Sequence, residues 1–117
     1  MVPTYNERES IADLIAAVLD AAGPTATEVV IVDDSSPDGT ANVVASLSAK
    51  HPGVRLHSRP KKMGLSGAVF AGIELAHGEY VCIMDADLSH DPEEIPEMLA
   101  LAQSGYDVVV GSGDDWM

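Results

Sequence analysis

Two aspartates, Asp85 and Asp87, stand one residue apart at the end of the apolar run 80–84. Residues i and i+2 of an extended chain point the same way, so both carboxylates could face one ligand. Paired carboxylates repel each other unless a cation lies among them, and Mg²⁺ or Mn²⁺ suits such oxygens together with substrate phosphates. An Asp-x-Asp pattern alone is equally typical of a solvated loop before a helix, so its meaning depends on its surroundings.

Two further polar clusters follow apolar residues. Asp33 and Asp34 come directly after the β-branched run 29–32, and the segment 3–7 follows the first apolar residues of the chain. Taken singly, each cluster is also explained as a turn with a helix cap. The carboxyl ends of parallel strands share one edge of a sheet, where ligands bind at the point at which the strand order reverses. We therefore expect the three clusters to converge in space.

The elements that must position these clusters alternate along the chain. The run 29–32 lacks polar alternation, which is typical of a strand covered on both faces. The alternation predicts a doubly wound α/β sheet. The expected helices cover about 7–22, 40–50, 66–77 and 92–103, and the expected strands cover 29–32, 54–57, 79–84 and 107–111.

Local signals mark several of these boundaries. Asn6 is a candidate N-cap of the first helix, with Glu9 three residues on. Asp91 precedes a proline and two glutamates, which is typical of a helix start, and Pro96 predicts an irregular first turn. The stretch 64–67 reads GLSG and predicts a tightly packed strand-to-helix turn; no P-loop is indicated, because the lysines precede it.

Composition narrows the classes of protein. The length of 117 residues and a hydrophobic content of 46% indicate one globular domain. Six basic against 19 acidic residues give a net charge of −13, which argues against a nucleic-acid partner. The single cysteine, Cys82, excludes a disulfide framework and fits a reducing cytoplasm. No apolar run approaches the roughly 20 residues of a membrane span, and no secretory signal is visible.

The stretches VPTYNERE, VDDSSPDGT, GLSGA and MDADLSHDPEEIP occur in this order. Together they resemble the catalytic domain of the dolichol-phosphate (polyprenol-phosphate) mannose synthases, family-2 inverting glycosyltransferases with the GT-A fold. The resemblance implies a Rossmann-like three-layer α/β/α sandwich with a mainly parallel sheet. It also implies that residues 1–117 are the nucleotide-sugar-binding part of that domain, incomplete at both ends. Gly113 stands where the family usually has an arginine.

The resemblance further implies transfer of mannose from GDP-mannose to a dolichyl or polyprenyl phosphate, with Mg²⁺ or Mn²⁺, at the cytoplasmic face of a membrane. Because the acceptor phosphate is already an anion, catalysis would depend on positioning and electrostatics rather than on a strong base. Asp87 would be the catalytic residue and main metal ligand, and Ser89 would complete the metal shell. The nucleotide-sugar-binding residues implied by the match are Pro3, Tyr5, Glu7, Val32, Asp34, Asp85, Ala86 and Asp87.

Three alternatives stay open on the sequence. A family-2 transferase using UDP-glucose or another nucleotide sugar would carry the same motifs. An inactive nucleotide-binding fragment would carry them as well. A phosphorelay receiver domain has a similar length and paired acids, but it needs a lysine after a late strand, and the last lysine here is Lys62.

Overall fold

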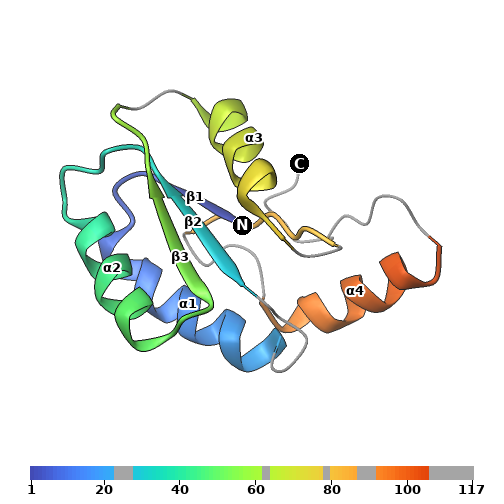
Figure 1. Ribbon diagram of the computed structural model, residues 1–117. Helices are drawn as coiled ribbons and strands as arrows, with labels where there is room; N and C mark the ends of the chain where they lie inside the picture. The colour runs from blue at the N-terminus through green and yellow to red at the C-terminus, as the bar shows by residue number, and fades with distance from the viewer. Residues whose placement is uncertain (23–27, 62–63, 78–79, 87–91, 106–117) are drawn as a thin grey trace.

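The sheet of this protein is parallel and has three strands. The computed structural model describes residues 1–22, 28–61, 64–77, 80–86 and 92–105. Strands β1 (Val2–Thr4), β2 (Val29–Asp33) and β3 (Val54–Ser58) pair in the order β1-β2-β3, with β2 in the middle (Figure 1). Both pairings are parallel, so the three carboxyl ends lie at one edge.

Helices cover both faces of the sheet. Helices α1 (Arg8–Ala22) and α2 (Thr40–Lys50) pack together on one face, and α3 (Leu65–Leu75) packs over β1 and β2 on the other. Helix α4 (Ile95–Gln103) lies beside α1. The expected α/β architecture, with helix layers on either side of a parallel sheet, is confirmed.

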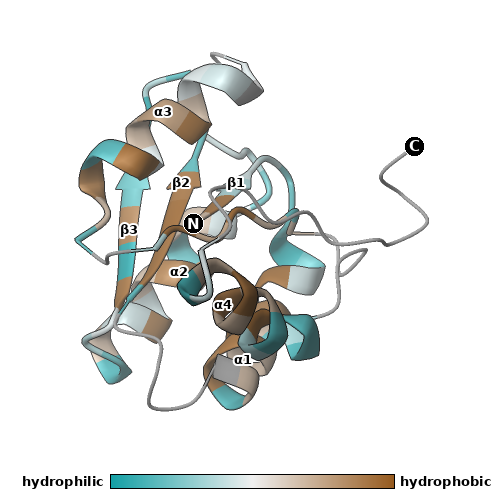
Figure 2. Ribbon diagram, turned by 90° about the vertical axis from the view of Figure 1, so that its right-hand side faces the viewer, coloured by the Kyte–Doolittle hydropathy of each residue, from teal (hydrophilic) through white to brown (hydrophobic). Residues whose placement is uncertain are grey.

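Strand β2 explains how the layers hold together. Successive side chains of a strand point to opposite faces. Val29 and Ile31 enter the larger core with α1 and α2, whereas Val30 and Val32 meet Ala68 of α3. All five residues of β2 are buried, as its unbroken apolar run predicted, and Figure 2 shows its hydrophobic colour between the helix layers.

A strand was expected at 79–84, but residues 80–84, the described part of that range, adopt no regular strand. This segment nevertheless runs beside β1. The Met1 amino group donates to the Cys82 carbonyl at 2.5 Å, and the Met84 amide donates to the Met1 carbonyl at 3.2 Å. This is one step of a parallel ladder, centred on Ile83.

That contact fixes the order of the sheet. The chain leaves β3 at one edge, passes through α3, and returns on the far side of β1. The direction of strand addition therefore reverses at β1. In open α/β sheets, ligands bind outside the carboxyl ends of the strands at such a reversal.

Two helix starts can be compared with their predictions. Helix α1 begins at Arg8, and the Ile11 amide donates to the Glu7 carbonyl at 2.9 Å, so Glu7 is the cap and the prediction of Asn6 was wrong. Asn6 instead adopts a left-handed conformation with φ 58°, which turns the chain into the helix. The irregular start predicted from Pro96 is confirmed, since a 3₁₀ turn, Pro92–Glu94, precedes α4. Asp91 and the strand expected at 107–111 lie outside the described residues.

Candidate functional site

The carboxyl ends of β1 and β2 meet at the edge where the strand order reverses. Thr4 pairs with Asp33, and the Asp34 amide donates to the Thr4 carbonyl at 3.2 Å. The returning segment joins them through Ser10 of α1, whose hydroxyl donates to the Ala86 carbonyl at 2.7 Å. The three polar clusters expected to converge therefore do so, as far as the described residues extend.

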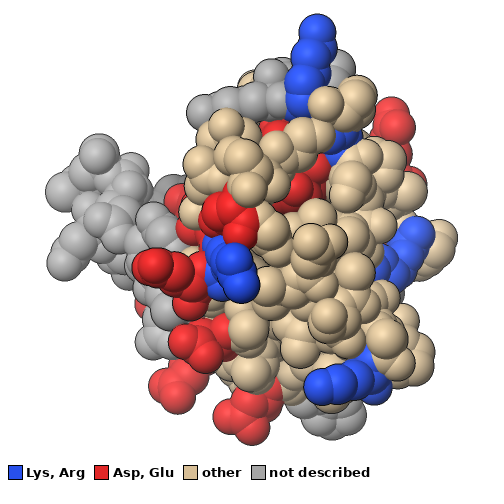
Figure 3. Space-filling model, turned by 90° about the vertical axis from the view of Figure 1, so that its left-hand side faces the viewer, with Lys and Arg blue, Asp and Glu red and all other residues tan. Residues whose placement is uncertain are grey.

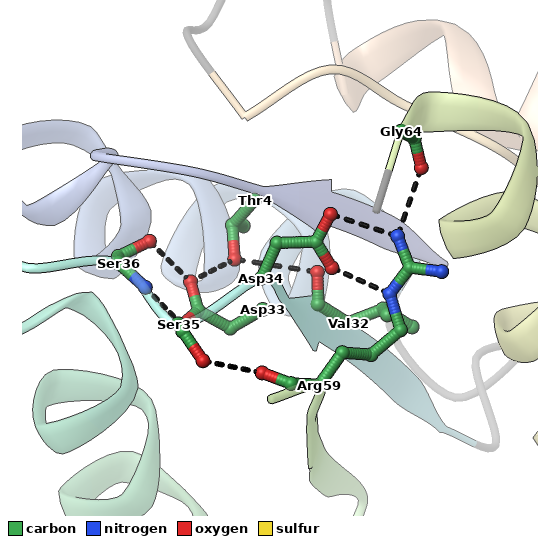
Figure 4. A network of polar contacts seen from close by, with 8 residues as sticks. All are labelled: Thr4, Val32, Asp33, Asp34, Ser35, Ser36, Arg59 and Gly64. Carbon is green, nitrogen blue, oxygen red and sulfur yellow. Dashed lines mark hydrogen bonds and ion pairs between the residues drawn. The ribbon is translucent and has the colours of Figure 1, made fainter. Parts of the chain in front are cut away.

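Asp33 braces this edge from inside the protein. Its side chain is fully buried, and one oxygen accepts hydrogen bonds from the Thr4 hydroxyl at 2.7 Å and the Ser36 hydroxyl at 2.6 Å (Figure 4). The other oxygen accepts the Ser36 amide at 3.0 Å. A buried carboxylate is tolerated only with such partners. Asp33 therefore connects the end of β1 to the loop after β2.

Asp34 faces Arg59, which follows β3. The guanidinium donates from Nε to one Asp34 oxygen at 2.5 Å and from Nη2 to the other at 2.7 Å. Both side chains are over nine-tenths buried, and this paired geometry is the strongest form of a protein ion pair. The hydrogen bond to Asp34 raises the pKa of Arg59 above its usual value. The pair thus fixes the direction of the Asp34 carboxylate.

The start of α3 completes the arrangement around Arg59. Nη2 also donates to the Gly64 carbonyl at 2.8 Å (Figure 4). A Cβ atom at Gly67 would lie 2.6 Å from Nη1, so only glycine lets the helix come this close. The tight packing predicted at this turn is confirmed. Arg59 itself was missed as a site residue; its position directly after a strand, at the same edge as the aspartates, was the available signal.

The structure places most of the residues that the sequence assigned to the site. Tyr5 and Asp85 are exposed, whereas Pro3 and Glu7 are half-buried. Val32 is fully buried under α3, so it can offer only its backbone to a ligand, and its carbonyl accepts the Thr4 hydroxyl at 3.5 Å. Ala86 is buried. Asp87 and Ser89 lie outside the described residues.

Potential metal ligands and membrane spans can be assessed only for the residues that the structure describes. Within those residues, no group of three His, Cys, Asp or Glu side chains is placed to hold a metal ion. Within the same residues, no helix is both long and apolar enough to cross a membrane. On the face shown in Figure 3, most acidic side chains lie on one side and others lie near the top, while basic ones are scattered.

Comparisons with known proteins agree with this arrangement. Residues 1–116 match the family described as Glycosyl transferase family 2. The chain is 42% identical to a dolichol-phosphate mannosyltransferase of Pyrococcus furiosus, over 96% of this chain and 32% of that protein. It is 40% identical to an undecaprenyl-phosphate mannosyltransferase of Micrococcus luteus, over 96% of this chain and 46% of that protein.

Solved structures show the same fold. The mannosyltransferase PcManGT from Pyrobaculum calidifontis, in complex with GDP-Man and Mn²⁺, superposes with a TM-score of 0.67 at 34% identity, over 74% of this chain and 26% of that one. Residues 1–349 of S. aureus TarS, in complex with UDP, superpose with a TM-score of 0.74 at 27% identity, over 89% and 31%. The chain spans less than half the length of each of these relatives. It belongs to glycosyl transferase family 2.

Proposed function

We propose that this chain is the nucleotide-sugar-binding part of an inverting glycosyltransferase that moves mannose from GDP-mannose to a dolichyl or polyprenyl phosphate. The observation that carries the proposal is the meeting of the β1 end, the β2 end and the segment ending at Ala86 where the strand order reverses. The similarity to two polyprenyl-phosphate mannosyltransferases, over nearly the whole chain, supports the choice of sugar and acceptor.

The nucleoside would lie against the ends of β1 and β2. Tyr5 is an exposed aromatic side chain at this edge, able to stack on a base. Arg59 holds the Asp34 carboxylate in one direction, which suits it to accept a hydrogen bond from the base or ribose. Pro3, Glu7 and the backbone at Val32 would line the same pocket.

The diphosphate would lie toward Asp85, Ala86 and Asp87. The donor set of Asp87 and the Ser89 hydroxyl consists of hard oxygen ligands, which fits Mg²⁺ or Mn²⁺, and Asp85, exposed at the edge of the sheet, would lie nearer the nucleotide. Asp87 would be the main ligand. When bound, the cation neutralises negative charge that builds up on the departing diphosphate. The protein side chains would then orient the donor.

The acceptor phosphate is anionic at neutral pH, so its oxygen can attack without a strong base. Catalysis by this part of the enzyme would therefore rest on positioning. A polyprenyl phosphate acceptor places the reaction at a membrane surface, and we place the protein at the cytoplasmic face. The main alternative to this proposal is that the chain uses another nucleotide sugar, since its structural relative TarS was solved with UDP.

A calorimetric titration separates these possibilities. The wild-type chain is titrated with GDP-mannose and with UDP-glucose, each with Mn²⁺ and with EDTA. We expect GDP-mannose to bind more tightly, to require Mn²⁺, and to lose affinity in Asp87→Ala. Asp13→Ala, which removes an exposed carboxylate of α1, is the matched control and should bind like wild type. Preference for UDP-glucose would favour that alternative, and no binding at millimolar nucleotide would indicate an inactive fragment.

A further inference from the structure

Three consecutive backbone amides at the start of α1 are bound by side chains of the segment 36–40, which includes the first residue of α2. The Asn6 amide donates to the Ser36 hydroxyl at 2.9 Å, and the Glu7 amide donates to the Thr40 hydroxyl at 3.0 Å. The Arg8 amide donates to an Asp38 carboxylate oxygen at 3.1 Å. Amides at a helix start have no partner within the helix, so these bonds satisfy groups that would otherwise need water.

Asp38 organises this contact because it serves two helices at once. One oxygen accepts the Arg8 amide of α1, and the other accepts the Thr40 amide at 3.0 Å and the Thr40 hydroxyl at 2.5 Å at the start of α2. Arg8 closes the contact from outside, since its Nη1 donates to the Asp38 carbonyl at 3.3 Å. The hydrogen bond from the Thr40 hydroxyl is the main reason that the pKa of Asp38 lies below its usual value.

The segment held in this way is the one that the proposed function assigns to the nucleoside. Asn6 lies between Tyr5 and Glu7 and adopts a left-handed conformation, which is uncommon for a non-glycine residue although asparagine tolerates it better than most. Such a conformation persists only where surrounding contacts hold it. The bonds from Ser36, Thr40 and Asp38 are those contacts. They set the path of the backbone that carries the Tyr5 ring to the edge of the sheet.

Asp38 can also be reached from solvent. It borders a shallow open hollow on the surface, together with Pro37 and the first residues of α1. A small carboxylate from solution could enter this hollow if the Asp38 side chain were removed.

We propose that Asp38 is a positioning residue for nucleotide binding: by holding the amides at the start of α1, it fixes the segment 5–7 in its binding conformation. The proposal rests on the proposed function, because it takes this segment to contact the nucleoside. In this proposal Asp38 acts without contacting the nucleotide. Its effect is transmitted through Arg8 and Thr40 to the backbone on which Tyr5 and Glu7 are carried.

The test removes the carboxylate and then supplies one from solution. In Asp38→Ala, we expect the affinity for GDP with Mn²⁺ to fall about tenfold, which is the scale of the lost charge-assisted hydrogen bond from the Arg8 amide. Sodium formate should restore much of that affinity, whereas sodium chloride at equal ionic strength should not. Amide hydrogen exchange at Asn6, Glu7 and Arg8 should accelerate in the variant and slow again with formate.

Two further variants make the result decisive. Asp20→Ala removes an exposed carboxylate of α1 and should change neither affinity nor exchange. Asp38→Asn keeps the shape of the side chain and one acceptor oxygen, so its affinity should lie between those of wild type and Asp38→Ala. It also serves as the test variant if Asp38→Ala folds poorly. Wild-type affinity in both Asp38 variants, or a loss that formate does not reverse, would overturn the proposal. If the wild type binds no nucleotide, the proposed function fails, and unchanged exchange at the three amides would still refute the role of Asp38.

Discussion

The ion pair between Arg59 and Asp34 gives the sharpest prediction for stability. Replacing Arg59 by methionine keeps much of the side-chain volume but leaves the Asp34 carboxylate buried without its cation. Both side chains are more than nine-tenths buried, so the carboxylate cannot recover full hydration. Removing one partner of a buried pair costs about 3–5 kcal/mol. The bond to the Gly64 carbonyl is lost as well, so we expect a value inside that range rather than below it.

The assay is urea unfolding followed by circular dichroism, with linear extrapolation to water. A small domain has about 5–15 kcal/mol of stability, so Arg59→Met should lower the urea midpoint strongly while the folded spectrum at zero urea is kept. The urea midpoint of Arg59→Lys should lie between those of Arg59→Met and wild type, because an ammonium group keeps the charge but cannot form the paired contact. Asp34→Leu combined with Arg59→Met should cost less than Arg59→Met alone, because no unpaired charge remains.

The matched control lies at the other end of the same strand. Arg55 pairs with Glu28 at 2.9 Å, but its side chain is 35% exposed and that of Glu28 is 12% exposed, and the Arg55 Nη1 also donates to the Leu75 carbonyl at 2.7 Å. Arg55→Met should therefore cost less than Arg59→Met, about 1–2 kcal/mol, from a partly exposed pair and one hydrogen bond to a carbonyl. Equal losses in the Arg55 and Arg59 variants would show that burial does not set the energy of the pair, and the reasoning would be refuted.

Two further predictions concern the surroundings of these pairs. Gly67→Ala should destabilise the protein by about 1–3 kcal/mol, because the new Cβ would meet the guanidinium of Arg59 while Asp34 holds it. In the Arg59→Met background this cost should largely disappear, which a double-mutant cycle measured by urea unfolding would show. Desolvation works against ionisation of Glu28, but hydrogen bonds from the His77 amide and the Arg55 guanidinium outweigh it and lower the pKa of Glu28 below 4.5. Its contribution to stability is therefore present above that pH and lost as the pH falls through the folded pKa, so Glu28→Gln should flatten the fall of the urea midpoint as the pH is lowered from above 4.5.

Strand β2 shows what could be predicted from the sequence alone. Its unbroken apolar run indicated burial on both faces, and its two faces do enter different cores. Its position before a pair of aspartates indicated the edge that carries the site. These inferences depend only on local pattern and on the common direction of parallel strands.

The contact between Asp34 and Arg59 could not be predicted in the same way. It depends on the register of β2 against β3, which pairs Asp33 with Ser58 and so brings the next two residues together. Register is set by packing across the whole sheet, not by the residues on either side of the contact. The prediction of Asn6 as the N-cap of α1 failed for a similar reason. Asn6 has the right chemistry for a cap, but Ser36 of a distant loop binds its amide, and the helix begins two residues later.

The filled start of α1 has a consequence for the charge of any ligand at this edge. In many α/β proteins the first turn of the helix after β1 receives a phosphate, because free amides and the helix macrodipole both attract anions. Here Asp38 already lies at that position and supplies the negative charge from within the chain. For a diphosphate approaching the same edge, the Arg8 amide is already bonded to Asp38, and the Asp38 carboxylate repels the diphosphate. In the proposed function, its counter-charge would therefore come from a divalent cation at Asp87 rather than from the start of the helix.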